Sequence, residues 1–222
     1  MGVAPPMMLP FQTSDDVDAA AAPVKAQLER GLLLAYPTET VYGLGSAPSD
    51  ASLTALAALK GRPPRKPFLL LVGSRLMAEQ WGLVFTASAR AMADEFWPGP
   101  LTLVLAGGEG RLPDRLRGPE GGIAVRHTSH AGMARLIQSI GMPVTSTSAN
   151  RPGGPPAPGV ERLVQLFQAA VDDGTLLVLD GGVLGNVPPS TIVDCTQQIP
   201  VMIREGALPR PLLRRRVGRL AP

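Results

Sequence analysis

The sequence predicts a single α/β domain, and three features carry that prediction. Short apolar runs typical of buried strands alternate with longer stretches of helical periodicity. The 222 residues suffice for one substantial core and are marginal for two. Hydrophobic residues make up 45% of the chain and charged residues 18%, which excludes a disordered chain.

Helix caps and helix breakers set the ends of the predicted helices. Gly31 follows the first helical pattern as its C-terminal cap. Asp50 can cap the second helix, which Gly61 ends. Thr86 can cap the third helix and Ser129 the fourth. The predicted helices are 23–30, 50–60, 86–96, 129–140 and 160–170.

Apolar runs between these helices predict the strands. The run from Leu32 to Tyr36 is one of them, and Pro37 stops it because proline cannot donate to a sheet ladder. A short strand begins at Val144 and runs into a loop of serine, threonine and asparagine. The remaining predicted strands are 68–72, 101–105, 123–125, 176–179, 191–194 and 201–204.

The chain divides into three predicted regions: an N-terminal extension (1–15), one catalytic domain (16–208) and a basic C-terminal tail (209–222). The proline- and glycine-rich segment 151–159 is a stiff loop and not a domain linker, because strand-like runs follow it. We expect the arginine-rich tail to be loosely ordered. It could touch RNA phosphates, although a solvated tail is the commoner interpretation.

Several features favour a cytoplasmic protein. The N-terminus has no basic segment and no sustained apolar run, which argues against a signal peptide. No apolar stretch is long enough to span a bilayer, so we expect no membrane contact. The single cysteine, Cys195, fits a reducing compartment and lies in a strand-like run, where a buried structural thiol is expected.

The net charge and the aromatic content indicate which kind of binding partner to expect. The formal net charge is +3 and the sequence pI is about 9.5, which favours anionic partners such as nucleotides or RNA. A solvated basic surface explains the same numbers equally well. Aromatic residues are only 4% of the chain, which argues against recognition by base stacking.

Common catalytic motifs are missing from the sequence. It contains no P-loop, no Gly-x-Ser-x-Gly elbow and no kinase catalytic loop. Gly43-Leu-Gly45 begins like a dinucleotide fingerprint but lacks the third glycine. His127 and His130 are the only histidines and have no nearby carboxylate or thiol set, so we expect no metal bound by protein side chains.

Polar segments at predicted strand ends carry the candidate chemistry. In the first, 36–45, a buried strand ends in hydroxyls and a carboxylate. Thr38 and Thr40 can hydrogen-bond a small polar ligand there, and Gly43 and Gly45 can let the backbone approach it closely. Polar loops after strands are common, so this segment alone is weak evidence.

The second segment, 60–67, crowds four cations into a turn stiffened by proline. Helix capping explains Lys60 but not the crowding, whereas a phosphate clamp explains both. The third segment, 143–150, supplies hydroxyls and an amide, which bind phosphate or ribose oxygens without adding charge. A turn that caps the strand is the alternative. We predict that Lys60, Arg62 and residues 148–150 belong to a single nucleotide-phosphate site.

The fourth segment contains arginines at strand ends. Ser190 opens one predicted strand and Arg204 closes the next, while Arg126 closes an earlier one. An arginine that ends an apolar strand is not expected to be buried without an anionic partner.

In this order, the segments closely resemble the Sua5/YrdC/YwlC family, the threonylcarbamoyl-AMP synthases. The resemblance covers most of the chain, from about residue 23 to residue 206. It rests on Pro-Thr-Glu-Thr-Val-Tyr-Gly-Leu-Gly (37–45), Lys-Gly-Arg-Pro (60–63), Trp-Pro-Gly-Pro-Leu-Thr (97–102), Ala-Val-Arg (124–126), Ser-Ala-Asn (148–150), Ser-Thr-Ile-Val-Asp (190–194) and Arg-Glu-Gly (204–206).

The resemblance implies a twisted, open mixed sheet flanked by helices, with a large basic cavity. It implies that L-threonine, bicarbonate and ATP react to threonylcarbamoyl-AMP and pyrophosphate. The product would feed the N6-threonylcarbamoyl modification of adenosine 37 in tRNA. The chain corresponds to the family's short, single-domain form, which would depend on other proteins for transfer to tRNA.

The resemblance also assigns roles to residues of this chain. Lys60 and Arg62 would be catalytic and would bind the triphosphate. Mg²⁺ would accompany ATP as cofactor. The expected ATP-binding residues are Lys60, Arg62, Ser146, Ser148, Asn150 and Arg204, and the expected threonine-binding residues are Thr38, Arg126 and Ser190.

Two other functions compete with this one. A non-catalytic module of the same fold could bind tRNA or double-stranded RNA, but intact Lys60, Arg62, Ser148 and Asn150 favour the enzyme. A carbamoyl-adenylate-forming relative from hydrogenase maturation usually sits in a much longer chain. Pro152 and Pro156 depart from serines expected in the family, which leaves nucleotide contacts of that segment open.

Overall fold

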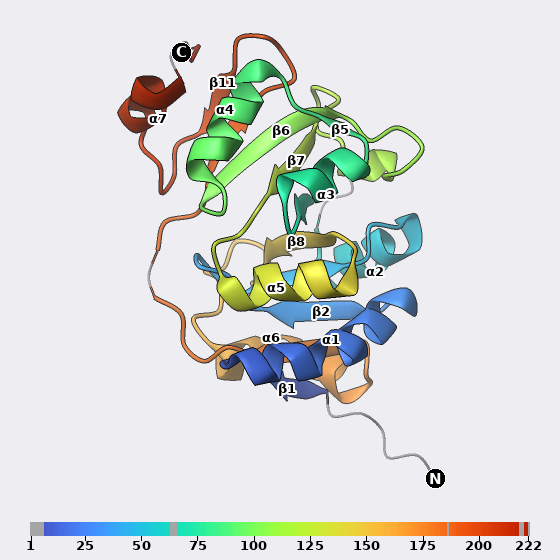
Figure 1. Ribbon diagram of the computed structural model, residues 1–222. Coiled ribbons are helices and arrows are strands. Elements are labelled where there is room, and N and C mark those ends of the chain that lie inside the picture. Colours follow the sequence, from blue (N-terminus) through green and yellow to red (C-terminus); the bar gives the residue numbers. More distant parts are fainter. Residues whose placement is uncertain (1–6, 63–65, 186, 218–219, 222) are drawn as a thin grey trace.

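The computed structural model describes residues 7–62, 66–185, 187–217 and 220–221. Its centre is a large mixed sheet flanked by helices, which confirms the predicted α/β fold (Figure 1). The strands run in the order β1-β9-β2-β3-β8-β4-β7-β6-β10-β11, and β5 pairs with β6 outside this path. They are β1 (Met8–Pro10), β2 (Leu33–Tyr36), β3 (Gly43–Ser46), β4 (Leu69–Leu71), β5 (Leu83–Val84), β6 (Leu101–Gly107), β7 (Ile123–Arg126), β8 (Val144–Ser148), β9 (Leu176–Asp180), β10 (Thr191–Asp194) and β11 (Val201–Arg204).

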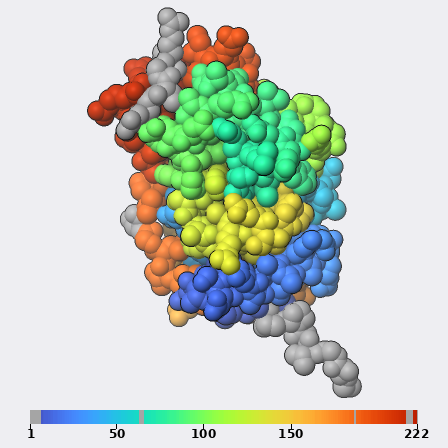
Figure 2. All heavy atoms as spheres, in the orientation of Figure 1, coloured from blue at the N-terminus to red at the C-terminus, as the bar shows by residue number. Residues whose placement is uncertain are grey.

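The helices of the described residues are α1 (Ser14–Glu29), α2 (Asp50–Lys60), α3 (Arg75–Gln80), α4 (Ala87–Phe96), α5 (Ala131–Ile140), α6 (Val160–Asp172) and α7 (Arg210–Val217), with a 3₁₀ turn at Asp114–Leu116. Helices α1 and α5 pack together in front of β2 and β8 in Figure 1. The space-filling view shows that α1, α5, α3 and α4 cover this face of the molecule (Figure 2). Within the described ranges, no helix is both long and apolar enough to cross a bilayer.

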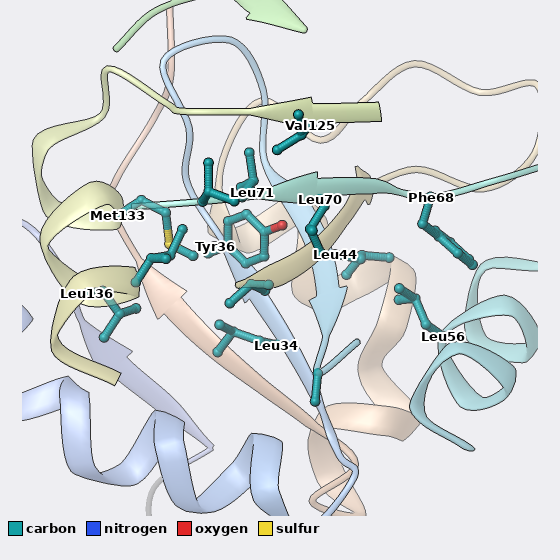
Figure 3. Close-up of a cluster of buried hydrophobic side chains, with 14 of the residues drawn as sticks. Leu34, Tyr36, Leu44, Leu56, Phe68, Leu70, Leu71, Val125, Met133 and Leu136 are labelled. Atoms are coloured by element: carbon teal, nitrogen blue, oxygen red, sulfur yellow. The ribbon is translucent and has the colours of Figure 1, made fainter. Parts of the chain in front are cut away.

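The core lies on both sides of β2. Leu34 and Tyr36 are fully buried, and Figure 3 shows Met133 and Leu136 of α5 projecting toward Tyr36. Leu33 points the other way, because successive side chains of a strand alternate between faces. It lines a cavity of about 350 Å³ between α2 and α6. Helices therefore cover both faces of this part of the sheet.

The helix expected over 23–30 begins earlier than predicted. Helix α1 starts at Ser14, because Thr13 and Asp16 form a capping box. The Thr13 hydroxyl accepts from the Asp16 N–H at 3.2 Å, and the Asp16 carboxylate accepts from the Thr13 N–H at 2.9 Å. Pro23, which suggested a helix start, lies inside α1. The strong cap upstream decided the boundary.

Three predicted caps are displaced by one residue. The C-terminal cap of α1 is Arg30 and not Gly31. Helix α2 is capped by Ser49, whose side chain accepts from the Ser52 N–H, and Asp50 is its first residue. Helix α5 is capped by His130, whose Nδ1 accepts from the Met133 N–H at 3.2 Å, and not by Ser129. Thr86 caps α4 as predicted.

The C-terminal tail is more ordered than expected. Residues 210–217 form α7, and Leu213 at its centre is fully buried. The Arg210 guanidinium donates to the Ala221 carbonyl at 3.0 Å, and Ala221 forms a parallel bridge with Val201 of β11. An apolar anchor within the basic segment holds the helix against the domain. At the other end, β1 pairs in parallel with β9.

Gly43 and Gly45 allow close packing within the sheet. They lie in β3, which occupies a position where the sequence predicted only a loop. A Cβ at Gly45 would stand 2.1 Å from the Thr145 carbonyl oxygen, and one at Gly43 would stand 2.8 Å from the Tyr36 ring. These glycines let β3 pass between β2 and β8 at close range.

Replacing Gly45 by alanine is therefore expected to destabilise the protein by about 3 kcal/mol, because a backbone oxygen blocks the added methyl group. Unfolding in denaturant measures the change. Gly185→Ala is the matched control, since its Cβ would meet nothing within 4 Å. It should stay within about 0.5 kcal/mol of the wild type. Equal stability of the two variants would contradict this explanation of Gly45.

Candidate functional site

Polar side chains project from one face of the sheet across neighbouring strands. Leu71 of β4 is paired with Arg126 of β7 and with Val144 of β8, so all three share a face. Ser146 and Ser148 follow Val144 at every second position and point the same way.

The same face continues across β6 and β10. The pairing of Leu103 with Val125 places Thr102 opposite Arg126. The Ser190 and Thr102 hydroxyl oxygens are 2.8 Å apart. Four residues predicted to bind substrate (Arg126, Ser146, Ser148 and Ser190) therefore lie on one face.

Lys60 joins α2 to the loop that follows β8. It is the last residue of α2, and its side chain is 6% exposed. Its Nζ donates to the carbonyl oxygens of Ser148 and Asn150, both at 2.6 Å, and to Asn150 Oδ1. The Ser148 hydroxyl also donates to Asn150 Oδ1. The structure thus brings together three residues that the sequence assigned to one phosphate site.

Arg62 contacts β8 itself, at Thr147, one residue before Ser148. Its Nη1 donates to the Thr147 hydroxyl at 2.9 Å, and its Nε donates to the Lys66 carbonyl at 3.0 Å. The guanidinium stacks on the Phe68 ring, 4.6 Å from its centroid. These contacts fix the cation beside β8. Arg65, another cation of the predicted clamp, is outside the described residues.

Arg204 lies at Ser190, whereas the sequence assigned it to the triphosphate beside Lys60. Its Nη2 donates to the Ser190 carbonyl at 2.7 Å and approaches the Ser190 hydroxyl at 3.4 Å. Burial and then the charge of Arg126 lower the Arg204 pKa, which places the two arginines in one electrostatic environment. Arg204 therefore sits with two residues predicted to bind threonine.

Thr38 and Ser146 make local contacts. The Thr38 hydroxyl donates to the Val41 carbonyl at 2.7 Å and lies 3.0 Å from the Thr40 hydroxyl, as in a hydroxyl-stabilised turn. Ser146 is buried and interacts with the Tyr36 hydroxyl. Both residues are buried.

Arg126 has the anionic partner that its position at a strand end requires. Its Nη2 lies 2.9 Å from Glu39 Oε2, and its side chain is only 6% exposed. The Thr128 hydroxyl donates to the same carboxylate oxygen. Burial alone would raise the pKa of Glu39, but the charge of Arg126 and these hydrogen bonds outweigh it, so the pKa lies below its usual value. Glu39 is therefore a carboxylate at neutral pH.

Lys60 is the most strongly perturbed cation of the site. Burial, together with the charges of Arg62, Lys66 and Arg151, lowers its pKa to about 8. Perturbed pKa values concentrate at functional sites.

The two cavities described in the structure lie beside these residues. The cavity between α2 and α6 is lined by Leu59 and Arg151, the neighbours of Lys60 and Asn150 in the chain. A second cavity, of about 230 Å³, is lined by Trp97 and His127, next to Arg126. A large basic cavity over the sheet face stays a prediction.

Sequence reasoning missed three contributors. Glu39 was noted only as a carboxylate in a polar loop, although the anion that Arg126 requires was a usable signal. Thr147 points to the opposite face from Ser146 and receives Arg62. Arg151 donates to the Leu59 carbonyl at 3.1 Å and to a carbonyl of α6, so it ties the loop after β8 to the end of α2. No sequence signal marks that last contact.

Cys195 is fully buried, as predicted, and burial raises its pKa to about 12. Such a thiol is inert at neutral pH. In the part of the chain that the structure describes, no three His, Cys, Asp or Glu side chains are grouped closely enough to hold a metal ion.

Comparison with known proteins gives a consistent set of matches. The family model Sua5/YciO/YrdC, described as "telomere recombination", matches residues 26–206. A Chromohalobacter salexigens protein named threonylcarbamoyl-AMP synthase is 42% identical over 185 residues, which are 82% of this chain and 94% of the relative. A Thiobacillus denitrificans protein of the same name is 36% identical over 83% of this chain and 95% of the relative.

A solved structure matches the fold closely. The crystal structure of Pyrococcus abyssi Sua5 complexed with L-threonine superposes with a TM-score of 0.84 at 29% identity. The match covers 97% of this chain and 62% of that chain. The chain therefore spans nearly all of the two bacterial relatives but less than two thirds of the archaeal protein.

Proposed function

The chain belongs to the Sua5/YciO/YrdC family, and on that premise we propose that it is an L-threonylcarbamoyladenylate synthase, a nucleotidyltransferase. It would convert L-threonine, bicarbonate and ATP to threonylcarbamoyl-AMP and pyrophosphate for tRNA N6-threonylcarbamoyladenosine synthesis. The observation that carries the proposal is that Lys60 hydrogen-bonds to Ser148 and Asn150, while Arg62 hydrogen-bonds to the neighbouring Thr147 of β8. An RNA-binding module would not need this arrangement, and the relatives' names favour the enzyme.

The chemistry explains why cations gather at this strand end. The amine of threonine and bicarbonate form a carbamate with loss of water. A carbamate oxygen then attacks the α-phosphorus of ATP, and pyrophosphate leaves. Both reactants are anions, so Lys60 and Arg62 would offset their repulsion and stabilise the leaving pyrophosphate. The carbamate is already a nucleophile, so positioning would supply most of the acceleration.

Lys60 would act in two ways. Its three contacts hold residues 148–150 in one conformation, and it shares Asn150 Oδ1 with the hydroxyl of Ser148. We place the triphosphate and ribose against this loop, at the end of β8 where Arg62 contacts Thr147. Arg126, Ser190 and Arg204 would receive threonine, and its carboxylate would face Arg126.

Mg²⁺ would enter with ATP. The side chains at the proposed phosphate site are cations, hydroxyls and an amide, which fit the triphosphate and not the ion itself. Mg²⁺ retains waters and commonly binds substrate phosphates. When bound, it would neutralise part of the triphosphate charge. Downstream, we expect a cytoplasmic transferase complex to move the threonylcarbamoyl group onto tRNA.

The deciding experiment incubates the protein with MgATP, bicarbonate and labelled L-threonine. We expect pyrophosphate release that requires threonine and a labelled adenylate of matching amount. Release without threonine, or no release at all, would contradict the proposed function. A parallel reaction without bicarbonate is the control, since the carbamate cannot form there.

The lowered pKa of Lys60 predicts how nucleotide binding depends on pH. Its cationic form is lost as pH rises through about 8, so affinity for MgATP should fall above that value, by about tenfold. Titration calorimetry without threonine from about pH 7 to about pH 9 measures this, because phosphate groups, with a second pKa of about 6, are already deprotonated. Lys60→Arg stays charged and should show no such fall. A decline that is equal in both proteins would exclude Lys60 as its source.

A further inference from the structure

The ion pair between Glu39 and Arg126 leaves some of its buried polar atoms without a hydrogen bond. Glu39 Oε2 receives hydrogen bonds from Arg126 Nη2 and from Thr128. Glu39 Oε1 and Arg126 Nε are also buried, and neither makes a hydrogen bond of normal geometry among the described residues, although the backbone N–H groups of Glu39 and Ser129 lie near enough to the carboxylate to lower its pKa. Leaving charged groups buried and unpaired is costly, so such atoms in a native site call for an explanation.

The two unpaired atoms have opposite requirements. Glu39 Oε1 needs a hydrogen-bond donor, ideally a cation, whereas Arg126 Nε needs an acceptor, ideally an anion. Both belong to one ion pair, so the groups that satisfy them must lie close together. An α-amino acid carries an ammonium and a carboxylate on one carbon atom. A phosphate or a simple carboxylate would satisfy Arg126 and leave Glu39 unpaired.

The surroundings fit a small polar amino acid. The Thr38 and Thr40 hydroxyls lie in the same loop as Glu39, and Arg126 Nη2 is 3.4 Å from the Thr40 hydroxyl. Arg204 adds positive charge nearby, which favours a carboxylate next to Arg126. The Glu39 side chain is 18% exposed, so the carboxylate lies at the edge of the buried region, although Oε1 itself is covered.

We propose that Glu39 binds the α-ammonium group of the amino-acid substrate through Oε1 and thereby selects amino acids over hydroxy acids. This inference rests on the proposed function and adds a specificity-determining residue to it. A ligand without the amino group leaves Oε1 buried and unpaired, which should weaken binding roughly 10- to 100-fold.

Binding of two ligands tests the inference. L-Threonine is compared with (R)-3-hydroxybutanoate, which has the same carbon skeleton, hydroxyl and carboxylate but no amine. Calorimetry of the wild type should show a 10- to 100-fold preference for threonine. Glu39→Gln should lose most of that preference by weakening threonine alone. Glu39→Asp, which keeps the charge beside Arg126 but shortens its reach, should retain part of it.

The matched control is Glu29→Gln, whose carboxylate is 60% exposed and lies 4.0 Å from Lys25. It should keep the wild-type preference. Equal weakening of both ligands by Glu39→Gln and Glu39→Asp would mean a merely structural role and would overturn the inference, as would an unchanged preference. Threonine-dependent pyrophosphate release by the wild type tests the proposed function separately from the role of Glu39. If the wild type releases pyrophosphate while Glu39→Gln keeps the preference for threonine, only the role of Glu39 is wrong.

Discussion

Replacing Lys60 by methionine is expected to lower turnover about 10²- to 10³-fold, the usual effect of removing one preorganised electrostatic contact to developing charge. The change removes a cation from beside the triphosphate. It also leaves the Ser148 and Asn150 carbonyls without their donor, so the loop that holds the nucleotide loses its anchor. Threonine-dependent pyrophosphate release measures turnover.

Stability should change much less than turnover. Each carbonyl left without a donor costs about 1–3 kcal/mol, but removing a buried charge relieves a desolvation penalty that offsets part of this loss. Lys25→Met is the control, because Lys25 is half exposed and its partner Glu29 is 4.0 Å away. It should leave both properties unchanged. Wild-type turnover in a folded Lys60→Met protein would refute the phosphate role of Lys60.

Local signals in the sequence predicted most helices and strands. The end of α2 at Lys60 and the cap of α4 at Thr86 follow from residues within one turn of the boundary. Errors at helix starts came from competing local caps, whereas a larger error arose where a distant contact decided the outcome. Gly43 and Gly45 suggested a ligand loop, but they form a strand that lies between β2, which directly precedes it, and β8, which is far away in the chain.

For the site, the sequence likewise predicted some features and not others. Lys60 and Asn150 were placed together by the order of the motifs, although 90 residues separate them. The partner of a given side chain was harder to foresee. Arg204 contacts Ser190 because β10 and β11 pair with each other, and that pairing depends on a bulge between Ile192 and Val193.

Replacing Arg126 by methionine should destabilise the protein by about 3–5 kcal/mol, the usual effect of removing one partner from a buried ion pair. Glu39 would then be a buried carboxylate held only by Thr128 and nearby backbone groups. Unfolding in denaturant measures the loss. Arg135→Met is the control: Arg135 and Asp18 are about half exposed, so breaking their pair should cost at most about 1 kcal/mol.

A second substitution separates the structural role of Arg126 from its role in binding. In the double variant Arg126→Met/Glu39→Gln no buried charge remains at the pair, so most of the lost stability should return. Turnover should not return, because neither group of the threonine zwitterion would then find its charged partner. A double variant no more stable than Arg126→Met would show that Glu39 is not the source of the destabilisation. Recovery of turnover together with stability would show that the pair supports the fold and does not bind substrate.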